Sequence, residues 1–452
     1  MTDRSRAGLR PPYFSLETTG KHILDAMTKA VDPGVLIHRA VKRRGDQLTI
    51  NGAGINLPDY SRVHCLGAGK ASAAMYLELL PMVQDRLAGG IVVAPPGAPD
   101  MPGPVSLLTA DHPVPGRRSL AATRRLLLYV EERIGPGDLV LFLLSGGASA
   151  LLAAPRSRVP AHKWQRLNRH LVSSGAPISD INCVRSALSR IKAGGLARAI
   201  YPAALWTLAI SDVIGSHPET IGSGPTAPVS KNFNPAARKI LQRHGLSSFL
   251  YLLDPATPTL RPGPLPSGRF AVIGDNRIAL EAGCRAAAEA GFSAGILTSR
   301  LQGSADSAAR RLARVMRRFL DPCTPRAWVF GGETTVKVKG RGKGGRNQEL
   351  VLRLLTRVDN WPGSWYAACM GSDGIDGNSP AAGAWISYHA AARLKRRQKE
   401  METALRENDS YRFFRRFGGL IETGPTGTNV MDLGVILLAP GGPASPNPGL
   451  VR

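Results

Sequence analysis

The amino-acid sequence predicts an α/β protein of two domains: a larger N-terminal one with a doubly wound, mostly parallel sheet and a smaller α/β one after it. Short apolar strands alternate with amphipathic helices along most of the chain. Several of these strands end in glycine-rich turns that lead into helices. The strand predicted over residues 138–144 is apolar after its first residue, as in a parallel sheet that helices cover on both faces.

The predicted elements of the first domain begin with two helices, over residues 17–30 and 33–44. Asp32 is a favourable N-cap for the second helix, and Pro33 is a favourable first residue. The elements that follow are strands over 62–66, 90–94, 105–109, 138–144 and 205–210, and helices over 72–80, 119–134, 161–173 and 180–193. We expect this first domain to span residues 14–255.

Prolines and glycines become frequent between residues 232 and 270, and we place the domain boundary there. The second domain is expected over residues 268–440. Its predicted elements are strands over 269–273, 294–298, 334–338, 366–370 and 433–438, another near Trp328, and helices over 276–290, 304–319, about 350–358 and within 391–417. The Pro- and Gly-rich tail after Pro440 is expected to be loose.

Composition and length are those of a globular protein. With 452 residues, 43% of them hydrophobic, the chain can form two or three domains with a sizeable core. No apolar run approaches the roughly 18–20 residues of a membrane-spanning helix, and the N-terminus lacks a secretory signal pattern. The five cysteines are odd in number and include no CxxC pair, which argues against a disulfide framework or a zinc site. We expect a cytoplasmic protein without a membrane partner, and the sequence leaves open a monomer or a homodimer.

The net charge of +25 raises the question of a nucleic-acid partner. The basic residues are, however, spread along the chain, often opposite the apolar face of a predicted helix, which is typical of a solvated surface. Only 6% of residues are aromatic, so few side chains are available to stack on bases. A cationic field that attracts small anionic substrates is the better interpretation, and we do not expect specific nucleic-acid binding.

The most informative stretch is GGETTVKVKGRGKGGRNQEL, residues 331–350. It predicts a strand, a loop rich in glycine and basic residues, and a helix with apolar positions at a helical period. Backbone N–H groups at the helix start, with Lys343 and Arg346 beside them, predict an anion site. The alternative is a flexible basic hairpin. The glycines expected to leave space for a ligand are Gly340, Gly342, Gly344 and Gly345.

Two further glycine-containing loops follow predicted strands, where open α/β sheets bind ligands. Residues 67–72, GAGKAS, place Lys70 at a helix start, but the spacing is not that of a Walker A loop. Residues 145–149, SGGAS, offer two glycines and two hydroxyls at another helix start, a suitable cradle for phosphate or carboxylate. The alternative for both loops is a tight turn, in the first case with a surface lysine.

Acidic residues also stand at predicted strand ends. Asp212 follows the strand over 205–210, and Asp373 and Asp376 flank glycines after the strand over 366–370. Such carboxylates suit a magnesium ligand or a general base, or they only cap turns. His112 is a candidate base or a rigidly held loop residue, and no histidine pair in the sequence has metal-ligand spacing.

The order of these motifs resembles that of the class II glycerate 2-kinases, the family with a C-terminal MOFRL domain. In the first half the motifs are GAGKAS from Gly67, HPVP from His112, SGGASALL from Ser145, INCVRSALSRIK from Ile181, SDV from Ser211 and SGPT from Ser223. In the second half they are the stretch from Gly331, SDGIDG from Ser372 and TGPTGTNVMDL from Thr423. The match spans about residues 20–440, and nine motifs in this order are highly specific.

The resemblance implies a kinase that transfers the γ-phosphoryl group of ATP to the 2-hydroxyl of D-glycerate, giving 2-phosphoglycerate. It implies a Rossmann-like first domain, a MOFRL domain and an active site in the cleft between them. By motif, Lys70 resembles the essential lysine of the family and Arg346 the essential arginine. These roles fit the chemistry, because fixed cations and Mg²⁺ must neutralise the charge of phosphoryl transfer. Asp212 is a further catalytic candidate, and Asp212 and Asp373 are candidate Mg²⁺ ligands. Substrate or phosphate is expected at Ser145, Gly146, Gly147, Ser149, Gly344, Gly345, Asn347 and Asn429.

The sequence departs from the family pattern at several places near the expected site. Acidic residues of the pattern are replaced at Gly116, Arg117, Ser216 and Pro380, and the KGGR motif appears as KAGG from Lys192. One alternative is therefore a weakened paralogue that binds anions or nucleic acid without kinase activity. The other is hydroxypyruvate reductase, a label carried by related proteins, although no GxGxxG with an acid about 20 residues further on follows a predicted strand.

Overall fold

The computed structural model describes residues 15–156, 159–227, 233–253, 266–319, 324–358 and 364–440. Residues 254–265 of the predicted boundary region 232–270 and the predicted loose tail after Pro440 lie outside these ranges. The described chain forms two compact units. The first unit comprises Asp32–Asp275 and Gly427–Val430; the second comprises 15–31, 276–426 and 431–440. Both units are α/β, as predicted.

Six parallel strands form the main sheet of the first unit, in the order β6-β5-β4-β7-β8-β9. The central strands β4 and β7 are buried at every position, which agrees with their nearly continuous apolar sequences. This order is that of a Rossmann-type doubly wound sheet, so the predicted fold class is confirmed. The strands are β4 (Val63–Ala68), β5 (Leu87–Ala94), β6 (Val105–Thr109), β7 (Leu139–Leu144), β8 (Ala204–Ile210) and β9 (Gly268–Gly274).

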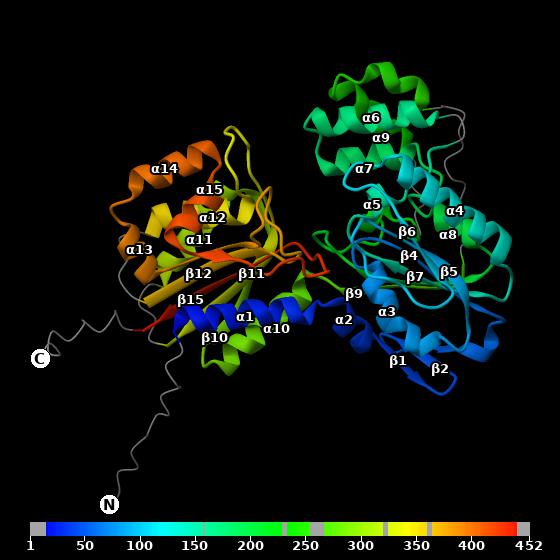
Figure 1. Cartoon of the computed structure of the whole chain (residues 1–452), viewed down its shortest axis with the longest axis horizontal. Coiled ribbons are helices and arrows are strands. Elements are labelled where there is room, and N and C mark those ends of the chain that lie inside the picture. Colours follow the sequence, from blue (N-terminus) through cyan, green and yellow to red (C-terminus); the bar gives the residue numbers. More distant parts are fainter. Residues whose placement is uncertain are drawn as a thin grey trace, which may run out of the picture. The chain divides into compact units, whose positions relative to one another are not determined.

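The second helix of the chain starts where the sequence offers a cap. The Asp32 carboxylate accepts hydrogen bonds from the N–H groups of Gly34 and Val35 at 2.9 and 3.1 Å, as expected for an N-cap. The helices are α2 (Pro33–Ala40), α3 (Ser72–Val83), α4 (Arg117–Arg133), α5 (Ala148–Leu151), α6 (Ala161–Ser173), α7 (Ile178–Ala187), α8 (Gly195–Ile200) and α9 (Asn234–Arg243). Figure 1 shows α3 and α4 running along the sheet.

The predicted helix over 33–44 is wrong in its second part. The chain leaves the helix after Ala40 and forms a three-stranded antiparallel sheet of order β1-β2-β3. Gly45, at φ +56°, lets the chain reverse direction, so strand pairing outweighs the helical pattern of the preceding residues. The predicted helix over 180–193 likewise ends early, at Ala187. The small sheet consists of β1 (Val41–Arg44), β2 (Gln47–Ile50) and β3 (Ala53–Asn56).

The second unit contains a six-stranded mixed sheet of order β10-β11-β15-β12-β13-β14. Its first two strands are parallel and the other neighbours are antiparallel. The two short strands predicted near Trp328 and over 334–338 are one strand, β11, which ends at Thr335. The strands are β10 (Ser293–Ser304), β11 (Arg326–Thr335), β12 (Ser364–Gly371), β13 (Gly383–Ser387), β14 (Leu420–Ile421) and β15 (Asp432–Ala439).

Helices cover both faces of this second sheet, with α1 and α10 on one side and α11 and α12 on the other (Figure 1). Gly20 of α1 lies so close to the Tyr366 ring that any Cβ would collide with it. The predicted basic helical region over 391–417 consists of three helices. The helices are α1 (Leu16–Ala30), α10 (Asn276–Glu289), α11 (Ala305–Arg318), α12 (Arg346–Val358), α13 (Tyr388–Leu394), α14 (Gln398–Glu407) and α15 (Ser410–Phe417).

Two elements lie in a different unit from the one that the sequence suggested. The strand over 269–273, expected to open the second domain, is the sixth strand of the first sheet, where it pairs in parallel with β8. Helix α1, expected in the first domain, packs in the second unit against α10, β12 and β15. Within the described ranges, no helix combines the length and apolar character needed to cross a membrane.

Candidate functional site

The strand order brings two of the predicted loops to the switch point of the first sheet. From β4 the sheet grows outward through β5 and β6 on one side, and through β7, β8 and β9 on the other. The loops that follow β4 and β7 therefore leave adjacent strands in opposite winding directions. Doubly wound sheets bind their ligands at this point.

These two loops are joined by direct hydrogen bonds. The Lys70 N–H donates to the Gly146 carbonyl at 2.9 Å, and the Ala71 N–H donates to Ser145 Oγ at 2.9 Å. Gly69 has φ +142°, and a Cβ at this position would collide with Ser145, so the close approach requires glycine. The structure thus brings together Lys70, Ser145 and Gly146, which the sequence analysis assigned to one site.

Asp212 and His112 also face the loop after β7. A Cβ at Gly146 would overlap the Asp212 carboxylate. A Cβ at Gly147 would lie 3.1 Å from His112 Cδ2 and 3.4 Å from Lys70 Cγ. Burial, and then the positive charge of Lys70, lower the pKa of His112 below its usual value, so its imidazole is neutral at pH 7. The side chains of His112, Asp212 and Lys70 therefore all lie against one glycine-rich loop.

Ser149 contacts a buried polar cluster that the sequence analysis did not assign to the site. Its hydroxyl lies 2.9 Å from Ser223 Oγ and 3.2 Å from Asn182 Oδ1. Lys192 Nζ donates to the Ser149 carbonyl at 2.7 Å and to its hydroxyl at 3.2 Å. Lys192 is fully buried, and burial, followed by the charge of Arg185, lowers its pKa well below the usual value. The signal in the sequence was the lysine of the altered KAGG motif.

Helix α5 is too short to provide the helix-start anion site that the sequence suggested after β7. It spans only four residues, Ala148–Leu151, so few peptide dipoles are aligned behind Gly146 and Gly147. An anion at this loop would therefore gain little from a helix dipole and would depend on side chains such as Lys70.

Arg346 is the first residue of α12, in the second unit. Its guanidinium donates to both carboxylate oxygens of Asp432, at 2.7 and 2.9 Å, and lies 3.1 Å from Glu333. Burial opposes its positive charge, but the charge of Asp432 and then that of Glu333 outweigh this effect and raise the pKa of Arg346 above its usual value. The arginine therefore stays charged, with a third of its side chain exposed.

The start of α12 is already capped by a carboxylate of the protein. The two oxygens of Asp376 accept hydrogen bonds from the N–H groups of Asn347 and Gln348, at 3.1 and 2.8 Å. Burial raises the pKa of Asp376 to about 6; the hydrogen bonds from Gln348 and Asn347 oppose this shift, and the nearby charge of Asp432 adds to it. These two N–H groups therefore already have an anionic partner and are not available to the predicted anion.

Asn347, expected to bind substrate or phosphate, is buried instead. Its amide nitrogen donates to Asp432 at 2.9 Å, and its amide oxygen accepts from the Cys369 thiol at 3.0 Å. Asn347 thus helps to hold the carboxylate that pairs with Arg346. Its role in the structure is to support the arginine.

The glycines of the loop before α12 make room for protein, contrary to the expectation that they make room for a ligand. A Cβ at Gly342 would lie 2.5 Å from Asp409 Cβ. The same substitution would cause collisions at the other three positions: at Gly340 with the Glu407 backbone, at Gly344 with Ser410 and at Gly345 with Asp376. This loop is packed against neighbouring chain and does not form the flexible hairpin considered as the alternative.

The two candidate magnesium ligands lie in different units, Asp212 in the first and Asp373 in the second. Among the described residues, no group of three or more His, Cys, Asp or Glu side chains could hold a metal ion. Asp373 accepts a hydrogen bond from the Ile375 N–H at 3.2 Å, as a turn-capping residue does. Asn429, expected to bind substrate or phosphate, lies in the short segment Gly427–Val430, which belongs to the first unit.

Asp212 fits a magnesium ion better than Asp373 does. Magnesium in nucleotide sites takes one or two carboxylates and completes its shell with phosphates and water. Asp212 is half-buried and its carboxylate lies against Gly146, on the candidate phosphate loop. One carboxylate in this position is compatible with a magnesium–nucleotide complex.

A Rossmann-type sheet with a lysine, a serine–glycine loop and a carboxylate at its switch point defines an α/β protein suited to a small phosphate-bearing ligand. Residues 19–251 match the family described as a domain of unknown function, DUF4147, and residues 326–432 match the MOFRL family. These two matches, together with the relatives described next, show that the chain belongs to the class II glycerate kinase family. The resemblance inferred from the nine motifs is confirmed.

Relatives match nearly the whole chain. The D-glycerate 2-kinase of Thermotoga maritima is 35% identical over 427 residues, which cover 93% of this chain and 98% of the relative. A protein of Agrobacterium vitis named as a hydroxypyruvate reductase is 36% identical over 429 residues, covering 92% and 93%. The crystal structure of glycerate kinase from Thermotoga maritima aligns with a TM-score of 0.79 at 33% identity, covering 92% of this chain and 98% of that one.

Proposed function

We propose that this protein is an ATP-dependent D-glycerate 2-kinase whose product is 2-phosphoglycerate. The observation that supports this most is the arrangement of Lys70, Ser145 and Asp212 around Gly146 at the switch point of the first sheet. The 35% identity with a relative named D-glycerate 2-kinase extends over nearly the whole chain and points to the same reaction.

In the proposed reaction, different residues supply the positive charges that phosphoryl transfer requires. Negative charge lies on the donor, on the transferred group and on the acceptor carboxylate, so fixed cations are needed. Lys70 supplies one beside the serine–glycine loop, and Arg346, which its acidic neighbours keep charged, supplies another. Mg²⁺, held by Asp212 and the nucleotide, would neutralise charge on the polyphosphate.

We assign to His112 the role of the base that takes the proton from the acceptor hydroxyl. As the 2-hydroxyl oxygen bonds to the γ-phosphorus and ADP leaves, the hydroxyl proton must pass to a base. His112 is neutral because burial and Lys70 lower its pKa, and its ring faces Gly147 of the serine–glycine loop.

Two departures from the family pattern keep a carboxylate nearby, which favours an active kinase over a weakened paralogue. Ser216 replaces an acid, but its hydroxyl lies 3.4 Å from the Asp275 carboxylate. Gly116 replaces another, and a Cβ at Gly116 would collide with Asp111. Negative charge is therefore present close to both altered positions.

The decisive experiment identifies the product. The protein is incubated with Mg-ATP and D-glycerate and coupled to enolase without phosphoglycerate mutase. We expect an immediate signal, because enolase accepts 2-phosphoglycerate directly. A signal that appears only after mutase is added would mean 3-phosphoglycerate and would refute the 2-position, and no signal in either case would refute kinase activity toward D-glycerate.

The name of the Agrobacterium relative makes hydroxypyruvate reduction the second candidate. The turn after β4 reads GAGKAS, with Ser72 where a dinucleotide-binding GxGxxG has its third glycine. We therefore expect no oxidation of NADH or NADPH with hydroxypyruvate. Turnover comparable to the kinase rate would favour the reductase instead.

A further inference from the structure

The loop that precedes α12 in the second unit is exposed and rich in basic residues. Residues 336–345, here called the basic loop, carry Lys337, Lys339, Arg341 and Lys343, whose side chains are exposed. The loop has no regular secondary structure. A loop of this kind holds its charges in fixed positions only if other parts of the chain bind its backbone.

The turn between α14 and α15, residues 407–410, binds that backbone and is here called the clamp turn. Asn408 Oδ1 accepts from the N–H groups of Lys339 and Gly340, at 2.7 and 3.1 Å. The Lys343 N–H donates to Asp409 Oδ1 at 2.8 Å, and the Gly342 N–H donates to the carbonyl of residue 407 at 2.9 Å. Four N–H groups of the basic loop are thus bound by the clamp turn.

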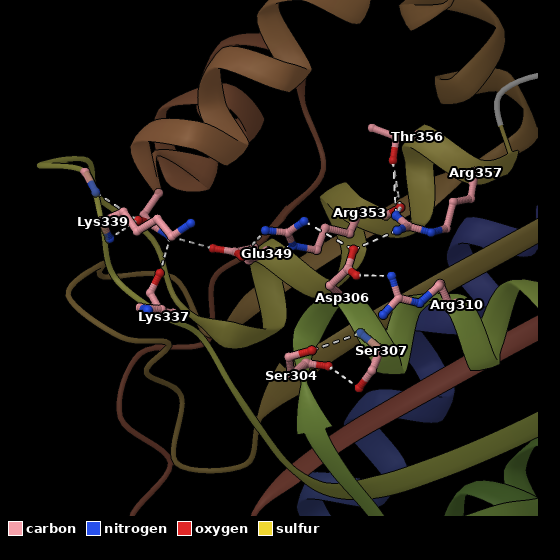
Figure 2. Close-up of polar contacts among 12 residues, drawn as sticks. Ser304, Asp306, Ser307, Arg310, Lys337, Lys339, Glu349, Arg353, Thr356 and Arg357 are labelled. Carbon is pink, nitrogen blue, oxygen red and sulfur yellow. Dashed lines mark hydrogen bonds and ion pairs between the residues drawn. The ribbon is translucent and has the colours of Figure 1, made fainter. Parts of the chain in front are cut away.

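A buried carboxylate fixes the orientation of the Asn408 amide. Asn408 Nδ2 donates to Glu349 Oε2 at 2.9 Å, and the other oxygen of Glu349 accepts from Arg353 at 2.9 Å. Arg353 in turn lies 3.2 Å from Asp306. Because a carboxylate only accepts, the amide nitrogen must face Glu349, and the amide oxygen must face the loop. Figure 2 shows the side chains from Lys337 and Lys339 through Glu349 to Arg353 and Asp306.

We propose that Asn408 is a positioning residue for the proposed kinase reaction. It accepts hydrogen bonds from two N–H groups of the basic loop and donates to a buried carboxylate, and so it holds the loop whose lysines and arginine would supply positive charge for a nucleotide polyphosphate. This inference rests on the proposed function for the identity of the ligand. The immobilisation of the loop by Asn408 does not depend on the proposed function, and it can be measured without an activity assay.

The first test removes only the side chain. Asn408 has φ +54°, which glycine adopts without strain, so Asn408→Gly deletes the amide and leaves the backbone as it is. We expect trypsin to cleave at the basic-loop lysines and arginine about tenfold faster, because the loop opens more often when it loses these hydrogen bonds. We also expect the KM for ATP to rise about tenfold, with a smaller change in kcat. Asn51→Gly, at φ +47° in the first unit, is the matched control and should change neither.

The second test exchanges donor and acceptor. Asn408→Asp keeps the shape and the acceptor for the loop but places a carboxylate against Glu349, so trypsin cleavage should increase. Glu349→Gln added to Asn408→Asp restores a donor–acceptor pair, and cleavage should return toward the wild-type rate. With Glu349→Gln alone as the fourth member, the cycle separates this coupling from the loss of the Arg353 ion pair. Additive effects would overturn the orientation of Asn408 by Glu349.

The outcomes distinguish this inference from the proposed function. Unchanged cleavage in Asn408→Gly would overturn the role of Asn408 in holding the loop. Faster cleavage with an unchanged KM for ATP would overturn its role in the reaction. A wild-type protein that does not phosphorylate D-glycerate refutes the proposed function, and with it the link to catalysis, while the cleavage rates still decide whether Asn408 holds the loop.

Discussion

Arg346 forms a bidentate pair with Asp432, a carboxylate that is only 4% exposed. Removing the guanidinium would leave this carboxylate buried beside Asp376 without its cation. Arg346→Ala should therefore lower the free energy of unfolding by about 3 kcal/mol, since loss of one partner of a buried pair is strongly destabilising. Urea unfolding measures this, with Arg341→Ala in the exposed basic loop as the control, expected within about 0.5 kcal/mol of wild type. Equal stability of the two variants would show that the pair with Asp432 does not stabilise the fold.

Replacement of Lys70 is expected to lower the catalytic rate more than the stability. Its side chain lies beside Gly147 and His112 and is only partly buried. Lys70→Ala should lower kcat in the enolase-coupled assay at least about 100-fold, because a fixed cation at the transferred phosphoryl group is lost, and the melting temperature should change little. Lys70→Arg, which keeps the charge, should recover part of the rate. Near-normal turnover of Lys70→Ala would remove this residue from the mechanism.

Asp376 gives the second unit a stability that depends on pH. Burial raises its pKa to about 6, above the value of about 3.9 expected in the unfolded chain. The folded protein therefore binds the proton more tightly between pH 4 and 6, so this contribution is fully present below about pH 4 and is lost as the pH rises through 6. Relative to Asp376→Asn, the wild type should gain about 2 kcal/mol of unfolding free energy between pH 7 and pH 4. Urea unfolding at both pH values measures the difference, and a difference that grows with rising pH would contradict the raised pKa.

At the scale of elements, the basic loop and the clamp turn form one packed unit. A Cβ at Gly340 would collide with the backbone of residue 407, which cannot move without displacing the end of α14. Gly340→Ala should therefore lower the free energy of unfolding by about 1–3 kcal/mol. Gly295→Ala is the control in the same unit, because nothing lies within 4 Å of its added Cβ. A urea midpoint for Gly340→Ala equal to that of the control would mean that the loop can move away at no cost.

For the whole molecule, the structure predicts where the chain can be divided. A fragment of residues 14–255 lacks β9, so β8 would become an exposed apolar edge strand, and it carries α1 without the sheet that covers it. A fragment of residues 32–275 keeps all six parallel strands. We expect fragment 32–275 to unfold cooperatively on heating. Fragment 14–255 should aggregate or melt at a temperature at least about 10 °C lower. Circular dichroism and light scattering measure this, and equal melting of both fragments would contradict the assignment of β9 and α1.

Much of the fold was predictable because its signals are local. The apolar runs of β4 and β7, the Asp32–Pro33 cap and the glycine-rich turns after strands each state a preference within a few residues. The predictions failed where a distant partner decides. Val41–Arg44 is a strand because Gln47–Ile50 pairs with it, and β9 joins the first sheet because β8 offers an open edge.

The candidate site divides in the same way. Lys70, Ser145 and Asp212 were predictable from residue type and from their place after strands, and the structure brings them to one loop. The loop before α12 was misread because a glycine has the same sequence signal whether its missing side chain makes room for a ligand or for protein. Lys192 was overlooked for a related reason: a lysine does not show in the sequence that it will be buried.

The sequence alone determined the α/β class, the doubly wound first sheet and the family to which the chain belongs, because these depend on the order and spacing of short motifs. Only the tertiary structure decided which partner each motif meets. The N–H groups at the start of α12 bind Asp376, those of the basic loop bind the clamp turn, and Arg346 binds Asp432. A hydrogen-bond donor or a charge is written in the sequence, but the acceptor that neutralises it comes from another part of the chain that folding brings into contact.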